Sequence, residues 1–187
     1  DLIVSTGVLH HMADPLVGMK ALRSCLRRDG VVAIMLYAKY GRVGVEALQS
    51  VFRDLGLAQD ERSVSLVKET MALLTSQHLV HPYRQIAPDL EFDAGLVDTF
   101  LHGRDRSYSV EDCLDLVSSA GLVFQGWLYN SLYYPEALIP LRSALYSEFV
   151  RLPTVRSWNT TISPSLVSCT SISSTSAPFS SAVLKAN

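Results

Sequence analysis

Two short apolar runs on either side of one helical pattern constrain the fold of this chain more than any other feature. Leu2–Val4 and Val31–Tyr37 are continuous apolar runs of the kind found in strands that are covered on both faces of a parallel sheet. Between them Asp14 and Pro15 favour a helix start, because Asp accepts hydrogen bonds from the first-turn amides and proline suits the first helical position. Gly30 can end that helix. We therefore predict a βαβ unit with parallel, neighbouring strands, the first of them interior to its sheet.

The residues from 40 to 103 carry no strand pattern, and we predict a helical insertion there. Apolar residues recur at helical spacing in two groups: Val45, Leu48, Val51, Phe52 and Leu55, then Val64, Val67, Met71 and Leu74. Pro82 and Pro88 follow these groups and interrupt any helix, which indicates a surface loop.

The α/β alternation resumes after the insertion. Ser109 and Asp112 are spaced as a helix cap, Gly121 stops that helix, and Leu122–Leu128 is the next strand candidate. The pattern of residues 135–150 predicts one more helix, and Pro140 should kink it or shorten its first turn.

The last 29 residues, 159–187, differ in character from the rest. Thirteen of them are Ser or Thr, none is acidic, and Lys185 is the one charged residue. This segment has no sustained period, so we predict a disordered, low-complexity tail, or a reading frame that is lost near Trp158.

Size and composition limit the class of protein. A chain of 187 residues with 48% hydrophobic and 18% charged residues is long enough for one globular domain. The net charge of -2 and the scattered Lys and Arg residues do not indicate a nucleic-acid partner. Cys25, Cys113 and Cys169 are too far apart for a zinc knuckle or a CxxC pair, which favours reduced thiols and a cytoplasmic location. No apolar run approaches the roughly 20 residues of a membrane-spanning helix, so we expect a soluble protein.

The order of these segments carries a family resemblance. A strand ending in "STG", the segment "VLHHMADP", a helix ending in "LRRDG" and the strand "VVAIMLYAKYGR" resemble the second half of a class I S-adenosylmethionine-dependent methyltransferase. The later "DTFLHGRDRSYSVEDCLDLVSSAGL" resembles a branch of that family with helices between the fifth and sixth strands. The resemblance covers residues 1–135 or so. It implies an α/β fold, a partial and mostly parallel Rossmann-like sheet with a helical insertion, in which residues 1–158 are the C-terminal part of a methyltransferase domain.

The departures from the family pattern are as informative. Family members bind S-adenosyl-L-methionine chiefly through a glycine-rich loop after the first strand and an acidic residue after the second, and this chain contains no GxGxG and starts at the fourth strand. We therefore expect a piece of a longer protein. The family also closes its sheet with an antiparallel strand after the last helix, and residues 159–187 offer no obvious one.

Candidate site residues follow the first strand. In an open α/β sheet, ligands bind outside the carboxyl ends of the strands, so Ser5, Thr6 and Gly7 are candidates to border the cofactor. The alternative is that they only form a tight turn. His10 and His11 are candidate bases for removing a proton from an acceptor hydroxyl or amine, or they cap and pack the turn.

Further candidates lie past the second strand. Tyr37 and Tyr40 are candidates to flank the acceptor or to face the sulfonium cation with an aromatic ring. The alternative is that they only pack in the core and at its rim. Arg42 is a candidate for an anionic substrate, or for a structural ion pair with Asp105; Arg104 has the same two alternatives.

Three other residue pairs are spaced so that they could bind a metal or form a structural contact. The neighbouring pair His10 and His11 lacks an acidic partner, and the pair His78 and His81 has no further ligand, so we predict no metal site. Asp98 and His102 have i, i+4 spacing, which favours a simple hydrogen-bonded pair.

The leading hypothesis is methyl transfer from S-adenosyl-L-methionine to a small organic acceptor, with the helical insertion as part of a lid. A second hypothesis is a non-catalytic remnant or binding module. A third, a nucleotide-dependent oxidoreductase, lacks its dinucleotide fingerprint in this chain.

Overall fold

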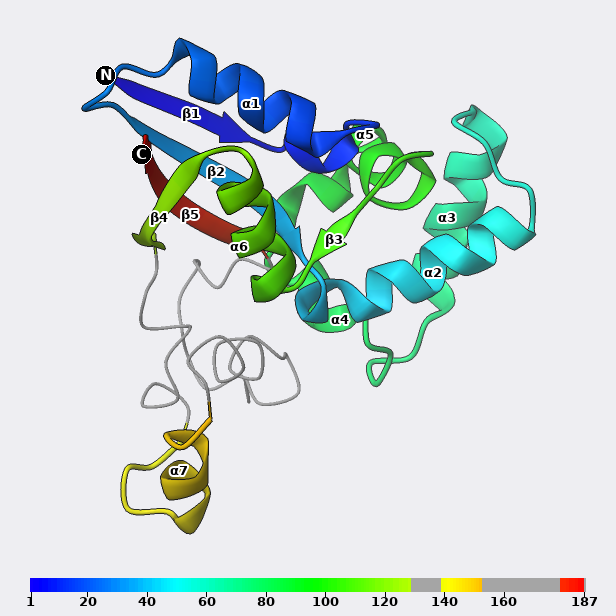
Figure 1. The fold of residues 1–187 in the computed structure, drawn as a ribbon. Helices are drawn as coiled ribbons and strands as arrows, with labels where there is room; N and C mark the ends of the chain where they lie inside the picture. Colours follow the sequence, from blue (N-terminus) through cyan, green and yellow to red (C-terminus); the bar gives the residue numbers. More distant parts are fainter. Residues whose placement is uncertain (129–138, 153–178, 187) are drawn as a thin grey trace. The chain divides into compact units, whose positions relative to one another are not determined.

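The computed structural model describes residues 1–128, 139–152 and 179–186, which divide into two compact units (Figure 1). The first, here called the sheet unit, contains residues 1–41 and the described residues from 106 onward. The second, the helical unit, contains residues 42–105. Each unit is described by itself.

The sheet unit is built on a mixed sheet. Its strands are β1 (Leu2–Thr6), β2 (Val31–Ala38), β3 (Ser107–Tyr108), β4 (Leu122–Trp127) and β5 (Phe179–Ala186). Strands β1 and β2 are parallel neighbours, with Leu2 opposite Val31, so the predicted βαβ unit is confirmed. The order is β1-β2-β5-β4, and the short β3 pairs in parallel with the carboxyl end of β2. The result is an open α/β sheet.

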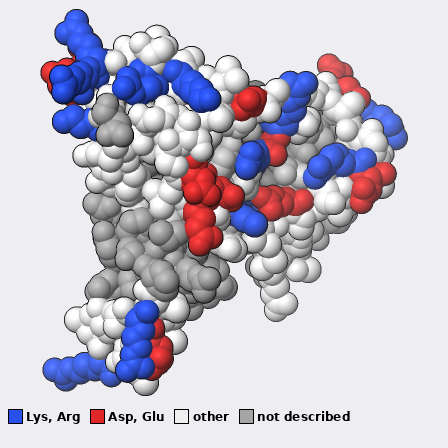
Figure 2. Space-filling model, viewed as in Figure 1, with Lys and Arg blue, Asp and Glu red and all other residues white. Residues whose placement is uncertain are grey.

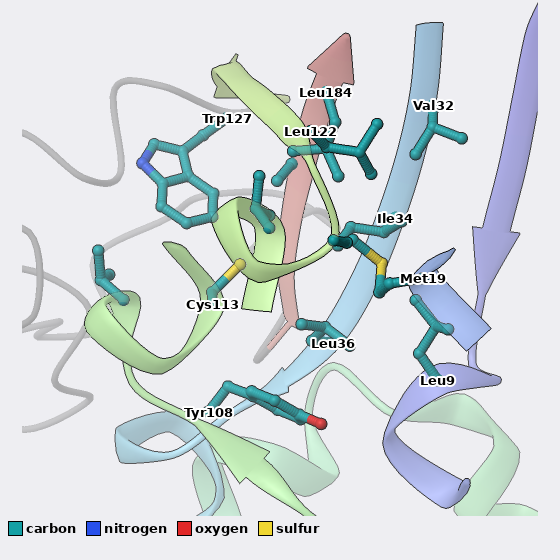
Figure 3. Packing of buried hydrophobic residues seen from close by; sticks show 14 of the residues in the cluster. Leu9, Met19, Val32, Ile34, Leu36, Tyr108, Cys113, Leu122, Trp127 and Leu184 are labelled. Atoms are coloured by element: carbon teal, nitrogen blue, oxygen red, sulfur yellow. The ribbon is translucent and has the colours of Figure 1, made fainter. Parts of the chain in front are cut away.

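Helices cover one face of this sheet. Helix α1 (Pro15–Cys25) begins at Asp14, whose side chain accepts from the Leu16 amide at 2.9 Å, and α6 (Val110–Ser119) begins with a capping box of Ser109 and Asp112. Both caps lie where the sequence predicted them. The buried side chains of these helices meet those of the strands in one core, shown in Figure 3: Leu9, Met19, Val32, Ile34, Leu36, Tyr108, Cys113, Leu122, Trp127 and Leu184.

The position of β1 differs from the prediction. In the described sheet β1 is an edge strand, and Leu2 and Val4 are 66% and 61% exposed, so the predicted interior strand is wrong for this chain. Side chains alternate between the two faces of a strand. Ile3 therefore packs against the core under α1, while Leu2 and Val4 point to the other face.

The structure of residues 179–186 also differs from the prediction. Residues 179–186 form β5, which pairs antiparallel with both β2 and β4, so the expectation of no strand after residue 158 is wrong for this segment. Ala182 and Leu184 are fully buried while Lys185 is exposed, the alternation of a strand. The backbone of β5 pairs with a strand on each side. This pairing stabilises the strand although its own sequence has only a weak strand pattern. The predicted frame loss near Trp158 lies outside the described residues.

The helical unit contains helices where the spacing of apolar residues predicted them. Its long helices are α2 (Val43–Asp54) and α3 (Glu61–Leu73), followed by α4 (His81–Arg84), the 3-10 turn η3 (Pro88–Glu91), α5 (Asp93–Leu96) and the π-helical turn η4 (Val97–Leu101). Its core consists of buried side chains from these elements: Val45, Leu48, Phe52, Val64, Val67, Met71, Val80, Tyr83, Ala87, Leu96, Phe100 and Leu101.

The two prolines of this unit act differently from the prediction. Pro82 lies in the first turn of α4, and Pro88 is the first residue of η3. Proline is tolerated there because the first turn of a helix leaves its amides unpaired. The predicted loop is therefore wrong, because short helical elements form here, although Pro82 and Pro88 are exposed as a surface segment requires; Tyr83 and Ala87 beside them are buried.

The helix predicted at residues 135–150 is shorter in the structure. Helix α7 spans Ala144–Phe149, and the Ser143 side chain caps it by accepting from the Tyr146 amide at 3.0 Å. Residues 140–143 are outside any helix, and residues 135–138 are outside the described part. The helix therefore starts after Pro140 and has no kink within its length.

Charge is mixed over the surface in view. Figure 2 shows acidic side chains interspersed with basic ones over much of that face. In the described residues, no helix is long and apolar enough to cross a membrane.

Candidate functional site

The three residues predicted to border a cofactor lie at the carboxyl end of β1: Ser5 and Thr6 are its last two residues, and Gly7 follows it. Ser5 is half-buried at the end of the strand, and Thr6 and Gly7 are exposed. Gly7 has a φ of 72°, in the left-handed region that glycine adopts without strain, and no atom lies within 4 Å of where a Cβ would stand. The backbone thus requires glycine for its turn, and it also leaves open space beside that turn. The alternative of a tight turn fits Gly7, whereas Ser5 and Thr6 are the last residues of the strand; the cofactor role stays a prediction.

The next turn brings three of the predicted site residues together. His10 and His11 lie in the 3-10 turn η1 (Leu9–His11), and the His10 ring stacks on the Tyr37 ring with centroids 3.6 Å apart. The His11 ring meets the edge of His10 at 4.3 Å and that of Tyr37 at 5.6 Å. We call these three residues the His–Tyr cluster. It lies where the carboxyl ends of β1 and β2 meet.

The two histidines of the cluster differ in burial. His10 is 1% exposed, so its stacked ring is part of the packing, whereas His11 is only half-buried and is accessible from solvent. A histidine can accept a proton only from a ligand that its ring can reach. By burial alone, His11 can be reached from solvent and His10 cannot.

Strand β3 closes the same end of the sheet with residues that the sequence did not indicate. The Arg106 amide donates to the His10 carbonyl at 3.2 Å, and the Lys39 amide donates to the Tyr108 carbonyl at 2.9 Å. Tyr108 is 2% exposed, and its burial raises the pKa of its hydroxyl. A two-residue strand has no periodicity from which it can be predicted.

Tyr40 and Arg42 belong to the 3-10 turn η2 (Tyr40–Arg42) after β2. Tyr40 is in the sheet unit and is 37% exposed. Arg42 is in the helical unit and is fully buried, and its guanidinium donates to the Asp105 carboxylate and to the Tyr83 hydroxyl, each at 2.8 Å. The structure therefore shows the ion pair, one of the two roles weighed for Arg42.

Gln49 and Tyr83 complete this buried network. The Gln49 amide donates at 2.7 Å both to Asp105 and to the Thr99 carbonyl. Burial raises the pKa of the Tyr83 hydroxyl, and the nearby Arg42 charge opposes that shift. Neither residue is recognisable from the sequence, because both are brought to Asp105 by contacts between distant segments.

One histidine of each remaining pair accepts a hydrogen bond from a nearby backbone amide, and the predicted Asp98–His102 hydrogen bond stays a prediction. His78 accepts from the Val80 amide at 3.1 Å, and His102 accepts from the Arg104 amide at 3.2 Å. Among the described residues, no three His, Cys, Asp or Glu side chains are grouped so that they could hold a metal ion.

Comparisons with known proteins place this geometry in context. No family model matches the chain. It is 28% identical over 160 residues to an uncharacterised protein of Synechococcus sp., a match that covers 81% of this chain and 38% of that protein. Two solved structures of PKMT2 from Rickettsia typhi, one of them in complex with AdoHcy, match all of this chain and 35% of theirs, each with a TM-score of 0.65 and with 12% and 13% identity.

At this level of identity the likeness concerns the fold alone. The chain has part of a methyltransferase-like α/β fold. It spans a little over a third of the length of the proteins that it matches.

Proposed function

We propose that this chain is the C-terminal part of an S-adenosyl-L-methionine-dependent methyltransferase that acts on a small organic acceptor in the cytoplasm. The observation that carries the proposal is β5. It lies antiparallel between β2 and β4 in a sheet whose other pairings are parallel. This is the closing strand that the family resemblance implies, and it supports the resemblance with a feature that the sequence pattern did not contain.

The carboxyl end of β1 and the turn that follows it fit one wall of a cofactor site. Ser5, Thr6 and Gly7 lie at the carboxyl end of a parallel strand, where ligands of open α/β sheets bind. The open space beside Gly7 leaves room for a ligand next to the backbone. When bound, S-adenosyl-L-methionine would supply an electrophilic methyl group. The solved structure with AdoHcy, the product of that reaction, has the same fold and supports this choice of cofactor.

The His–Tyr cluster supplies positioning and one proton acceptor. Methyl transfer depends chiefly on holding two reacting atoms in line, and proton removal is a secondary need for a neutral acceptor. His10 and Tyr37, stacked and buried, fix the turn, and His11 is the residue that we assign as the base. Tyr40, exposed just beyond β2, is the side chain that we assign to acceptor contact.

One face of the sheet supports the proposal that the chain is part of a longer domain. Strands of parallel sheets are normally covered on both faces. Here α1 and α6 pack on one face, while apolar side chains on the other are exposed or half-buried. We call this set the open face: Leu2, Val4, Val31, Ala33, Met35, Val123 and Val183. In our proposal, polypeptide encoded upstream covers it.

The experiment that tests the proposal compares two glycines in the protein encoded by the complete open reading frame. Gly7 and Gly56 both have a positive φ, 72° and 68°, and neither has an atom within 4 Å of its Cβ position. Replacement by valine therefore strains both turns alike. We expect Gly7→Val to weaken S-adenosyl-L-methionine binding about tenfold or more in calorimetry, because its side chain would enter the proposed site. Gly56→Val should leave the affinity unchanged.

Two outcomes would contradict the proposal. If the complete protein does not bind S-adenosyl-L-methionine, the alternative of a non-catalytic binding module replaces it. If the 187-residue chain alone binds the cofactor as tightly as the complete protein does, the missing polypeptide does not form most of the site.

A further inference from the structure

We propose that two copies of this chain associate through an exposed apolar face of α2 (Val43–Asp54), with the two helices antiparallel about a two-fold axis. All of the residues that carry this inference belong to the helical unit. It uses none of the residues assigned to the cofactor or the acceptor, so it is independent of methyl transfer.

Helix α2 is apolar on two of its faces. The first face packs in the core of the helical unit, where its residues are at most 5% exposed: Val45, Leu48 and Phe52. The second face consists of residues at intervals of four, which we call the α2 stripe: Val43, Ala47, Val51 and Leu55. Residues four apart follow one another along one side of a helix, so the stripe runs the length of α2.

The α2 stripe is exposed in the described structure. Val43, Val51 and Leu55 are 45%, 50% and 67% exposed, and Ala47 is exposed as well. A helix that is apolar on all sides is normally buried on all sides, and contiguous exposed apolar surface marks sites of association. The stripe therefore has the character of an interface that this chain alone does not cover.

The stripe is complementary to itself when two helices run antiparallel. With the two-fold axis level with residue 49, Val43 lies opposite Leu55 of the second copy, and Ala47 lies opposite Val51 of the second copy. A two-fold interface uses the same surface on both copies, so each of these contacts is made twice. Near the axis a small side chain faces a larger one, which lets the two helices approach closely.

The charges on α2 select the antiparallel arrangement. Glu46 and Arg53 are about two helical turns apart, so they lie on the same side of α2. The antiparallel register brings Glu46 of each copy within one residue of Arg53 of the other, which gives two ion pairs. A parallel arrangement places Glu46 opposite Glu46 and Arg53 opposite Arg53, and like charges repel.

Both side chains are available for these ion pairs. Among the described residues, neither Glu46 nor Arg53 belongs to a salt bridge. The side-chain hydrogen bond of Arg53 runs from Nε to the Gln49 carbonyl at 3.3 Å, which leaves its terminal nitrogens for the second copy. The exposed Asp54 of each copy also comes level with the first turn of the other α2, where the helix dipole stabilises a negative charge.

The size of the contact sets the expected affinity. Stable interfaces between proteins bury about 1,200–2,000 Å² in total. A pair of 12-residue helices is small by this standard, so we expect a reversible dimer with a dissociation constant on the order of 10–100 µM.

The test is sedimentation equilibrium of the 187-residue chain carrying Val4→Lys, because the open face offers a second route to association. Adding Val51→Lys should weaken the dimer about tenfold or more, since it replaces an apolar contact with a buried charge. Val17→Lys is the matched control, because Val17 is 59% exposed on α1 in the sheet unit. It should leave the dissociation constant unchanged.

A charge exchange tests the register. Glu46→Arg places an arginine opposite Arg53 of the second copy, and Arg53→Glu places a glutamate opposite Glu46, so each change alone should weaken the dimer about tenfold. The two changes together restore opposite charges, and the dissociation constant should return to within about threefold of its starting value. Because the double variant carries both changes, its recovery separates a lost ion pair from a damaged fold.

The proposal is overturned if no dimer forms at concentrations of about 1 mM. It is also overturned if Val17→Lys weakens association as much as Val51→Lys does, or if the double charge variant associates as weakly as the single ones. None of these readouts involves S-adenosyl-L-methionine, so this proposal and the proposed methyl transfer fail independently.

Discussion

At the scale of single residues, burial decides what the charged side chains of the helical unit do. The side chain of Arg42 is fully buried and that of Asp105 is 8% exposed, and each satisfies the other at 2.8 Å. Removing two charges from water is expensive, and their attraction repays the cost only with good geometry and further hydrogen bonds. Tyr83 and Gln49 provide those bonds. The pair therefore holds together segments that are 63 residues apart.

The first prediction follows from this pair. Asp105→Asn leaves the Arg42 guanidinium buried without a counter-charge, so we expect the free energy of unfolding to fall by about 3–5 kcal/mol. Urea denaturation followed by far-UV circular dichroism measures this change. The control is Glu148→Gln, which breaks the exposed ion pair with Arg151 and should cause no measurable change. Equal stability of Asp105→Asn and the wild type would refute the role assigned to the buried pair.

The second prediction concerns the two described cysteines. Burial raises the pKa of the Cys113 thiol to about 12, whereas Cys25 is exposed. Since the thiolate is the reactive form, Cys113 should not react with a thiol reagent in the folded chain near neutral pH. We expect Cys25→Ala to remove one fast-reacting group, and Cys113→Ala to remove none. Loss of a fast-reacting group in Cys113→Ala would contradict the burial of this thiol.

The same shift predicts a loss of stability in alkali. A pKa that is raised in the folded state means that the neutral thiol is favoured there, so this contribution is complete below the ordinary thiol pKa near 9 and is lost as pH rises toward 12. The free energy of unfolding of the wild type should fall more steeply over that pH range than that of Cys113→Ala. Parallel curves would show that Cys113 ionises equally in both states.

At the scale of elements, close backbone approach explains one glycine of the helical unit. Gly44 lies in the first turn of α2, and a Cβ there would collide with the backbone of Leu79 and Val80, just before α4. Backbone atoms do not move aside as the end of a flexible side chain does. The packing of α2 against the segment before α4 therefore depends on the absence of a side chain at this position.

The third prediction tests that contact. Gly44→Ala should lower the free energy of unfolding by about 1–3 kcal/mol, the usual cost of forcing extra atoms into a packed contact. Gly103→Ala is the matched control, because no atom lies within 4 Å of its Cβ position. It should be neutral or slightly stabilising. Urea titrations measure the free energy of unfolding of both variants. If Gly44→Ala is as stable as Gly103→Ala, α2 and the segment before α4 are not in close contact.

Elements with local signals were predictable from the sequence, and elements set by distant partners were not. Asp14 and the Ser109–Asp112 pair mark their helix starts with side chains that bond within three residues, so the signal and the structure are local. The strand Phe179–Ala186 has two serines and alanines in place of a clear apolar alternation, and its pairing with β2 joins residues far apart in the chain. No window of the sequence contains that information.

The candidate site shows the same division. The turn at Ser5–Gly7 and the histidines after it follow a strand end, so the sequence brought them to attention together. Tyr108 reaches this end of the sheet only because β3 pairs with β2, across more than sixty intervening residues. The short strand has no pattern of its own, and only the folded arrangement reveals it.

At the scale of the whole chain, the sheet has one packed face and one open face. Leu2, Val4 and Val123 on the open face are 66%, 61% and 40% exposed, and β1 is an edge strand in the described sheet. Exposed apolar patches and unpaired strand edges both promote association. The isolated chain should therefore associate through this face when nothing else covers it.

The fourth prediction replaces one residue of the open face with a charge. Val4→Lys should reduce the binding of a hydrophobic dye and the concentration-dependent self-association seen by analytical ultracentrifugation, because lysine on an exposed strand edge opposes pairing. Its free energy of unfolding should change little, since Val4 is 61% exposed. Leu73→Lys is the control, because Leu73 is 76% exposed on α3 in the other unit and should leave self-association unaltered. A wild-type chain that stays monomeric and binds no dye, or an equal effect of both variants, would mean that the open face is covered in the isolated chain.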